Sequence, residues 1–369
     1  MTPSIVLKRT VKVEAWRVIG QIAKTTKRPE LMPMLLRVQD QVSSDAHDIA
    51  QHLLFEGQSR LVVAERLLKI GELYGLLGRE DSDFFLTEAG EQTLRSDEVF
   101  VPEYGTWTIW ATDDPLLDSP IIAIEPWEEP NAYDEVWGKK KEEAKVRTFK
   151  KLPSHIKGRI GLVQKLRGSA GQQMRIDSLE EKGEFAPEDQ RTITLEWDIT
   201  NKSLRLEGMG IKTQLPAPKV SAQDAWMQLL QGVSLYQDWD STHSELKVSF
   251  AQTTEVEKTS MTRTLEFPAP AITRFGSFEH LEVPRVTITA VDPKEATEWA
   301  EWRLESQIDD YATQTNFARW VESALEPFIR FGVKLENRST MAQRFWKTRG
   351  SKPSAKAWHL TAAEDWRLS

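Results

Sequence analysis

The spacing of apolar residues changes twice along this chain of 369 residues, and this change limits the folds that it can adopt. Val11–Ala23 carries apolar side chains at a three-residue step, which predicts a helix. Arg191–Ile199 alternates apolar and polar residues instead, which is typical of a strand, and similar alternation recurs up to residue 290. Asp292-Pro-Lys-Glu295 then marks a helix start, with Asp at the cap and Pro in the first turn. The pattern predicts an α+β protein of several domains.

A second informative stretch, residues 64–94, reads AERLLKIGELYGLLGREDSDFFLTEAGEQTL. Gly75-Leu-Leu77 ends a predicted helix, a polar turn follows, and Leu86-Thr-Glu-Ala-Gly90 leads from a short strand into the next helix. This order resembles the end of a winged helix-turn-helix, in which a Gly-Leu-Leu step, a short hairpin and a Leu-Thr-x-x-Gly motif follow one another. The resemblance covers about residues 43–96. It implies a winged helix there, and winged helices bind either DNA or proteins.

These patterns predict four consecutive regions. They are an N-terminal winged-helix domain (1–105), an acidic connector (106–138), a basic, β-rich α+β domain (139–290), and a helical C-terminal domain with a basic tail (291–369).

Charge is strongly segregated along the chain, although the formal net charge is −8. Lys139–Arg175 holds twelve lysines and arginines against two glutamates, whereas Asp113–Glu135 holds eight acids and no base. The tail from residue 338 is also basic and contains three spaced tryptophans. Segregation of this kind creates basic surfaces on an acidic protein, and such surfaces attract phosphates.

The candidate nucleic-acid-binding side chains fall in three places. They are Arg60, Arg66 and Lys69 on the predicted recognition helix, Lys150, Lys151, Lys157, Arg159, Lys165 and Arg167 in the basic block, and Arg344, Lys347 and Arg349 in the tail.

Each place also has a second interpretation. The predicted recognition helix contains Glu65 and Glu72, and its wing is acidic and would repel phosphates, so this domain could contact protein in place of DNA. The basic block could pair with the acidic run that precedes it, on this chain or on a neighbouring subunit. The tail combines cations with tryptophans, a combination that suits single strands, but it could equally dock a protein partner.

The motifs of common enzymes are missing from the sequence. It contains no cysteine, no phosphate-binding Gly-x-x-x-x-Gly-Lys-Ser/Thr loop and no Gly-x-Ser-x-Gly elbow, and its six histidines are dispersed. We therefore expect neither a metal nor a cofactor. One alternative is a divergent restriction-type nuclease, in which Glu245-Leu-Lys247 would act with Asp198 from an earlier strand.

No run approaches the roughly 18 uncharged apolar residues of a membrane helix, and the first residues lack the apolar core of a signal peptide. We expect a cytoplasmic protein without a membrane partner. The function expected is that of a non-catalytic, nucleic-acid-binding adaptor subunit in a larger prokaryotic DNA- or RNA-processing complex, in the setting of antiviral defence. We expect DNA in preference to RNA, and one or more protein partners. A purely protein-binding adaptor is the other alternative.

Overall fold

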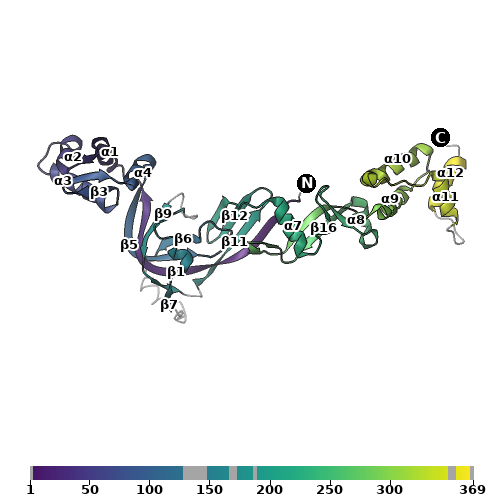
Figure 1. Cartoon of the computed structure of the whole chain (residues 1–369), viewed down its shortest axis with the longest axis horizontal. Helices are drawn as coiled ribbons and strands as arrows, with labels where there is room; N and C mark the ends of the chain where they lie inside the picture. The colour runs from purple at the N-terminus through teal and green to yellow at the C-terminus, as the bar shows by residue number, and fades with distance from the viewer. Residues whose placement is uncertain (1–2, 128–147, 166–172, 186–188, 348–354, 366–369) are drawn as a thin grey trace, which may run out of the picture. The chain divides into compact units, whose positions relative to one another are not determined.

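The computed structural model describes residues 3–127, 148–165, 173–185, 189–347 and 355–365, apart from the side chains of residues 165 and 362–365. It has mixed α and β structure, as predicted, with a curled sheet and helices toward the C-terminus (Figure 1). The chain divides into two compact units. The sheet unit comprises residues 10–195 and 204–216, and the C-terminal unit comprises residues 1–9, 196–203 and 217–369. These boundaries differ from the four consecutive regions expected, because segments far apart in the sequence pair with one another.

The N-terminal segment is a strand, so the helix predicted for Val11–Ala23 is wrong. Strand β1 (Val6–Thr26) pairs with β5 (Val99–Ala111) in unbroken antiparallel register, from Glu14 opposite Ala111 to Thr26 opposite Val99. A three-residue step in a strand places successive apolar side chains on opposite faces. Ile19, which the helix would have buried, is accordingly 38% exposed.

β1 is the centre of a ten-stranded sheet with the order β13-β12-β11-β1-β10-β7, in which β5 pairs with β1 and β6, and β9 with β1 and β8 (Figure 1). The other strands are β6 (Ile121–Pro126), β7 (Thr148–Lys151), β8 (Val163–Lys165), β9 (Gln173–Leu179), β10 (Lys182–Phe185), β11 (Arg191–Asp198), β12 (Ser203–Gly208) and β13 (Ile211–Pro216). One face carries a hydrophobic core that includes Trp16, Val18 and Phe185, and the short helix α6 (Ser154–Lys157) adds Ile156 to it.

Residues 32–96 form a separate lobe within the sheet unit (Figure 1). The elements are α1 (Met32–Gln41), β2 (Ser43–Ser44), α2 (Ala46–Leu53), α3 (Arg60–Leu73), β3 (Leu77–Glu80), β4 (Asp83–Leu86) and α4 (Glu88–Ser96). The strands form a small sheet in the order β2-β4-β3 around a separate core. Asp45 and Thr87 cap α2 and α4 by accepting bonds from the amides of Asp48 (2.8 Å) and Gly90 (3.2 Å).

The C-terminal unit combines a four-stranded sheet, in the order β14-β15-β19-β16, with helices. Its elements are α7 (Ala222–Gly232), β14 (Trp239–Asp240), β15 (Glu245–Val248), η2 (Phe250–Gln252), α8 (Glu255–Ser260), β16 (Thr262–Phe267), β17 (Ala271–Ile272), β18 (Gly276–Ser277), β19 (Leu281–Ala290), α9 (Pro293–Gln307), α10 (Gln314–Leu325), η3 (Glu326–Phe331), α11 (Arg338–Lys347) and α12 (Ala355–Asp365). The helix start predicted at Asp292 is confirmed, since this side chain accepts a bond of 2.9 Å from the Glu295 amide.

The carboxylate of Glu295 has a longer-range role. It accepts bonds from the Ser249 hydroxyl (2.8 Å) and from the Phe250 amide (3.1 Å), and so ties α9 to the segment after β15. Of the helices that the structure describes, none is long and apolar enough to span a membrane.

Candidate functional site

The register of the main sheet aligns polar, charged and aromatic side chains on the face opposite its core. In antiparallel strands, residues directly opposite one another point to the same face. A row across five strands consists of Phe149, Glu184, Arg17, Thr108 and Glu125. The neighbouring positions on the same face are Lys151 opposite Lys182, Ile19 opposite Thr106, and Trp127, whose ring lies over Arg17. We call these ten residues the outer sheet face.

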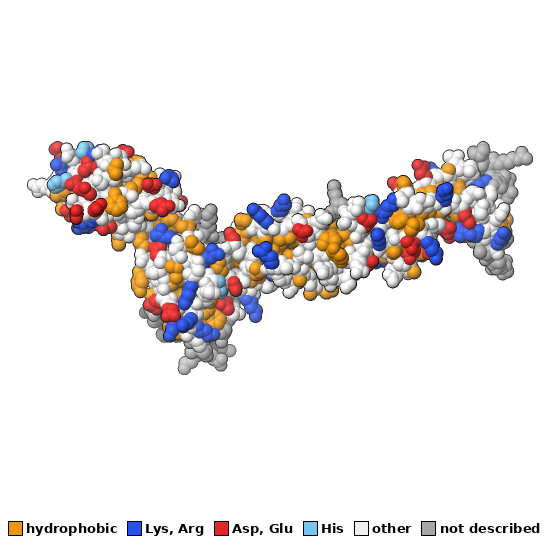
Figure 2. Space-filling model, viewed as in Figure 1, with side chains coloured by type: hydrophobic (Ala, Val, Ile, Leu, Met, Phe, Trp, Pro, Cys, Tyr) orange, Lys and Arg blue, Asp and Glu red, His pale blue; other side chains and the backbone are white. Residues whose placement is uncertain are grey.

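The most accessible part of this face lies on β7 and β10. Phe149 is 76% exposed, and both Lys151 and Lys182 are exposed. Two lysines directly opposite one another repel, and the Glu181 carboxylate lies 3.5 Å from the Lys151 ammonium. Figure 2 shows lysine and arginine side chains gathered over this part of the sheet unit. Two lysine side chains and an aromatic ring therefore share this exposed edge of the sheet.

Arg17 occupies the middle of the face. Its guanidinium donates to the Glu184 carboxylate at 2.8 Å and lies 4.2 Å from the centre of the Trp127 ring. Trp127 is held in place by its own amide, which donates to the Thr106 carbonyl at 2.9 Å. Guanidinium and indole therefore form a flat, half-buried platform of the kind on which a planar group can stack.

Both carboxylates of the face have partners. Glu184 accepts from Arg17, and Glu125 accepts a bond of 3.2 Å from the indole nitrogen of Trp110. Trp110 in turn lies beneath the Arg191 guanidinium, at 4.2 Å. Because each acid of the face has a neighbouring donor, the charge of the exposed edge is set by Lys151, Lys182 and the adjacent Glu181, and it is positive on balance.

Only one of the predicted basic-block residues, Lys151, lies on the outer sheet face. Lys150 points to the other side of β7, where its ammonium lies 4.9 Å from the Phe185 ring. Lys157 ends α6 on the core side of the sheet and is half-buried. Lys165 lies in β8 but its side chain is not described, and Arg167 and Arg349 lie outside the described residues.

Arg159 joins the basic block to the acidic run. Its guanidinium donates to the Asp118 carbonyl at 2.6 Å, and the two segments together line a pocket of about 370 Å³. Asp113, Asp114 and His155 also line this pocket. The contact joins the two segments through a backbone carbonyl, so the second interpretation, in which their charges pair, stays a prediction.

The predicted recognition helix, α3, exposes both cations and apolar side chains. Arg60, Arg66 and Lys69 are exposed. Four large apolar residues are exposed beside them, namely Val62, Val63, Ile70 and Leu73. Leu73, at 72% exposed, is the most accessible of these four.

The tail residues of the C-terminal unit are mostly engaged in packing. Arg344 lies among three glutamates and donates to Glu305 at 3.1 Å, with Glu336 also at 3.1 Å and Glu301 at 3.9 Å. Burial, the largest effect, raises the pKa of Glu301. Trp346 and Trp358 pack edge to face against each other, with ring centres 5.7 Å apart. Lys347 is exposed.

The residues of the nuclease alternative lie on strands of different sheets, and two of them are engaged by other side chains. Asp198 accepts two bonds of 2.8 Å from Asn201 and so stabilises the turn between β11 and β12. Glu245 is bound by the guanidinium of Arg330, whereas Lys247 is exposed. Strands β11 and β15, which carry Asp198 and Glu245, belong to different sheets. Within the described ranges, no group of three or more acidic or histidine side chains could hold a metal ion.

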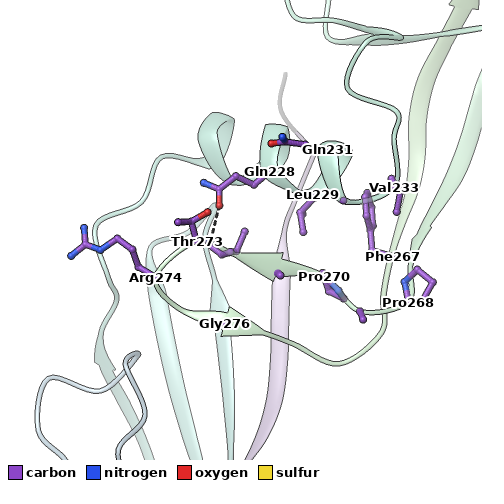
Figure 3. Close-up of a pocket in the computed structure, with 14 residues that line it drawn as sticks. Gln228, Leu229, Gln231, Val233, Phe267, Pro268, Pro270, Thr273, Arg274 and Gly276 are labelled. Carbon is purple, nitrogen blue, oxygen red and sulfur yellow. Dashed lines mark hydrogen bonds between the residues drawn. The ribbon is translucent and has the colours of Figure 1, made fainter.

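The C-terminal unit contains a larger pocket of about 770 Å³ between the end of α7 and the β17–β18 hairpin (Figure 3). Its lining is mainly apolar, with Leu229, Phe267 and Pro270 among its residues. Gln228 accepts a bond of 2.7 Å from the Thr273 amide and so fixes the hairpin to α7. Among the lining residues that the structure describes, Arg274 is the one charged side chain.

The other nine residues of the outer sheet face were not predicted from the sequence, among them Arg17, Trp127, Phe149 and Lys182. Alternate residues of a strand point to the same face, so a strand at Thr148–Lys151 would have placed Phe149 and Lys151 together. Arg17 could not be found in this way, because its segment was assigned to a helix. No protein-family model matches the sequence, and comparisons with curated proteins and with solved structures gave no match.

Proposed function

We propose that this protein is a non-catalytic subunit that binds nucleic acid through its phosphates on the outer sheet face. The observation that carries the proposal is the pair of opposed lysines, Lys151 and Lys182, beside the exposed ring of Phe149. Like charges directly opposite one another destabilise a sheet, and an anion bound beside them would reduce their repulsion. A phosphate supplies that anion, and Arg17 lies farther along the same face.

The overall acidity of the chain is compatible with this proposal. A formal charge of −8 is an average, whereas binding depends on the local field within about a Debye length, roughly 8–10 Å. On the outer sheet face both acids have donors, and the two lysines of the β7 edge outnumber the neighbouring Glu181, so the charge of this edge is positive on balance. Contacts to phosphates position a nucleic acid without reading its sequence.

The test is fluorescence anisotropy of the full chain with labelled DNA and RNA at several salt concentrations. In the double variant Lys151→Glu/Lys182→Glu, we expect weaker binding and a shallower salt dependence, by about one unit of slope for each phosphate contact removed. The matched control is Lys219→Glu/Lys334→Glu, which changes the net charge equally at two exposed lysines elsewhere. Equal loss of binding in both double variants would contradict a specific site.

We also propose that residues 43–96 form a winged helix. The support is the order of their elements, with a strand, two helices and a two-stranded hairpin in succession, closed by the Thr87 cap. The apolar side chains on α3 favour a protein partner over DNA at this helix, because a DNA-reading helix presents mainly polar groups to the groove. The second candidate function is therefore that of an adaptor that holds a protein partner through α3.

The adaptor function predicts that one substitution on α3 separates the two kinds of binding. Leu73→Asp should abolish capture of the protein partner, because a charge would then have to be buried at the interface, and should leave nucleic-acid binding unchanged. Affinity purification from the native host, followed by mass spectrometry, measures the first effect. Ile329→Asp, at a residue of the C-terminal unit that is 75% exposed, is the control. Retention of every partner by Leu73→Asp would exclude α3 as the docking surface.

A further inference from the structure

We infer that the nucleic acid bound on the outer sheet face is single-stranded, with a base stacked on Phe149. This inference rests on the proposed function and names the form of its ligand. The first argument is the exposure of the ring. A phenyl group that is 76% exposed on a strand, two residues from a lysine on the same face, has a large apolar surface in water. An unpaired base covers that surface while its phosphate meets the lysine.

The second argument is the order of groups along the row. Phe149 on β7 is followed by Glu184 on β10 and Arg17 on β1, and the Trp127 ring lies over Arg17. Neighbouring strands lie about 4.8 Å apart, so the two aromatic positions are separated by roughly 10 Å of sheet. Aromatic side chains interleaved with cations are what single strands require, because bases stack on the rings and the backbone follows the charges.

The third argument is that the face offers little to a duplex. The bases of a duplex are stacked on each other and reach a protein only through the grooves, which admit a helix or a protruding ribbon. The described rows of the outer sheet face belong to a continuous sheet. Its hydroxyls, Thr106 and Thr108, and its carboxylate Glu125 can meet base edges only if the bases are unpaired.

The experiment uses the full chain and labelled oligothymidylate, oligouridylate and a mixed-sequence duplex of the same length. We expect tighter binding of both single strands than of the duplex. Phe149→Ala should weaken single-strand binding about five-fold or more, as expected for one stacked base, and leave duplex binding unchanged. Phe149→Trp should retain the affinity, because it preserves the stacking surface. The control is Phe55→Ala, which removes a phenyl ring that is 98% exposed in the loop after α2.

The outcomes separate this inference from the proposed function. If Phe149→Ala behaves like Phe55→Ala while Lys151→Glu/Lys182→Glu still loses binding, phosphate binding holds and the single-strand inference fails. If the duplex binds as tightly as both single strands, the inference also fails. If none of the three probes binds at low salt, the proposed function fails and the inference fails with it. Thymidylate and uridylate differ in sugar and base, so unequal affinities would identify the preferred nucleic acid.

Discussion

Gly20 lies where β9 comes closest to β1. A Cβ atom at this position would overlap the carbonyl oxygen of Ser178 and lie 2.8 Å from Cδ2 of Leu179. The register of the pair also shifts between Gln21 and Ile22, so the strand is irregular at this point. On the other side of β1, Gly20 is opposite Gly105, where an added Cβ has only one neighbour, at 3.9 Å. Position 105 therefore has room for a side chain, whereas position 20 does not.

We predict that Gly20→Ala destabilises the protein and that Gly105→Ala does not. A carbonyl oxygen held in a sheet cannot move away, so the added methyl group costs about 1–3 kcal/mol. Urea unfolding followed by tryptophan fluorescence measures the difference between the two midpoints. A Gly20→Ala midpoint equal to that of Gly105→Ala would show that β9 can shift without cost.

At the scale of elements, α1 and α2 are joined by one ion pair. Arg37 donates from Nε and Nη2 to the two carboxylate oxygens of Asp48, at 2.9 and 2.6 Å. These hydrogen bonds are the main reason that the pKa of Asp48 lies below its ordinary value of 3.8. A carboxyl group with a lowered pKa in the folded state adds stability above its unfolded pKa, and this stability is lost as the pH falls through the folded pKa.

We therefore predict a pH-dependent effect of Asp48→Asn. The variant should unfold at a lower temperature than the wild type at neutral pH, and this difference should close in acid below the ordinary carboxyl pKa. Differential scanning fluorimetry across this pH range measures it. Asp83→Asn, at an exposed residue of β4, serves as the control. A difference between wild type and Asp48→Asn that is constant with pH would mean that the pair does not act through its charge.

The C-terminal helices illustrate why the charge of a side chain does not reveal its role. Arg344 looks like a phosphate ligand in the basic tail, but α11 places it beside Glu305 of α9 and Glu336. Glu245 looks like a nuclease carboxylate, but η3 brings Arg330 to it. In both cases the charged side chain forms an ion pair with a residue far away in the sequence. The local sequence pattern does not predict that partner.

At the scale of the whole molecule, the two compact units are interleaved along the chain. The first nine residues belong to the C-terminal unit, where Ile5 and Leu7 are fully buried. The Lys8 carbonyl accepts a bond of 2.8 Å from the Glu279 amide, and the Arg9 guanidinium lies 4.9 Å from the Phe278 ring. The first nine residues therefore form part of the C-terminal unit, although they precede the sheet unit in the sequence.

We predict that deletion of residues 1–9 unfolds or loosens the C-terminal unit. Loss of each buried aliphatic side chain costs about 2–5 kcal/mol, which is a large part of the 5–15 kcal/mol that stabilises a typical domain. Limited proteolysis with mass spectrometry should then find new cleavage sites within residues 217–347. Lys8→Ala is the control, because it removes only an exposed ion pair with Glu196. An unchanged cleavage pattern after the deletion would show that this unit folds without its N-terminal segment.

The sequence by itself determined the features that depend on residues a few positions apart. Asp45, Thr87 and Asp292 cap helices because each side chain reaches an amide three residues ahead. The alternation in Arg191–Asp198 likewise produced the strand expected there. The mixed α and β composition and the C-terminal helices followed from these local rules.

Only the tertiary structure decided which distant residues share a face. Val11–Ala23 became a strand because pairing with β5 over thirteen positions satisfies its backbone and outweighs a three-residue apolar step. Pairing of β1 with β10, and of β10 with β7, then placed Arg17 in one row with Phe149, more than a hundred residues later in the chain. Register between strands is fixed by long-range packing and hydrogen bonding, which the order of residues within one segment does not contain. The outer sheet face is therefore a product of the fold.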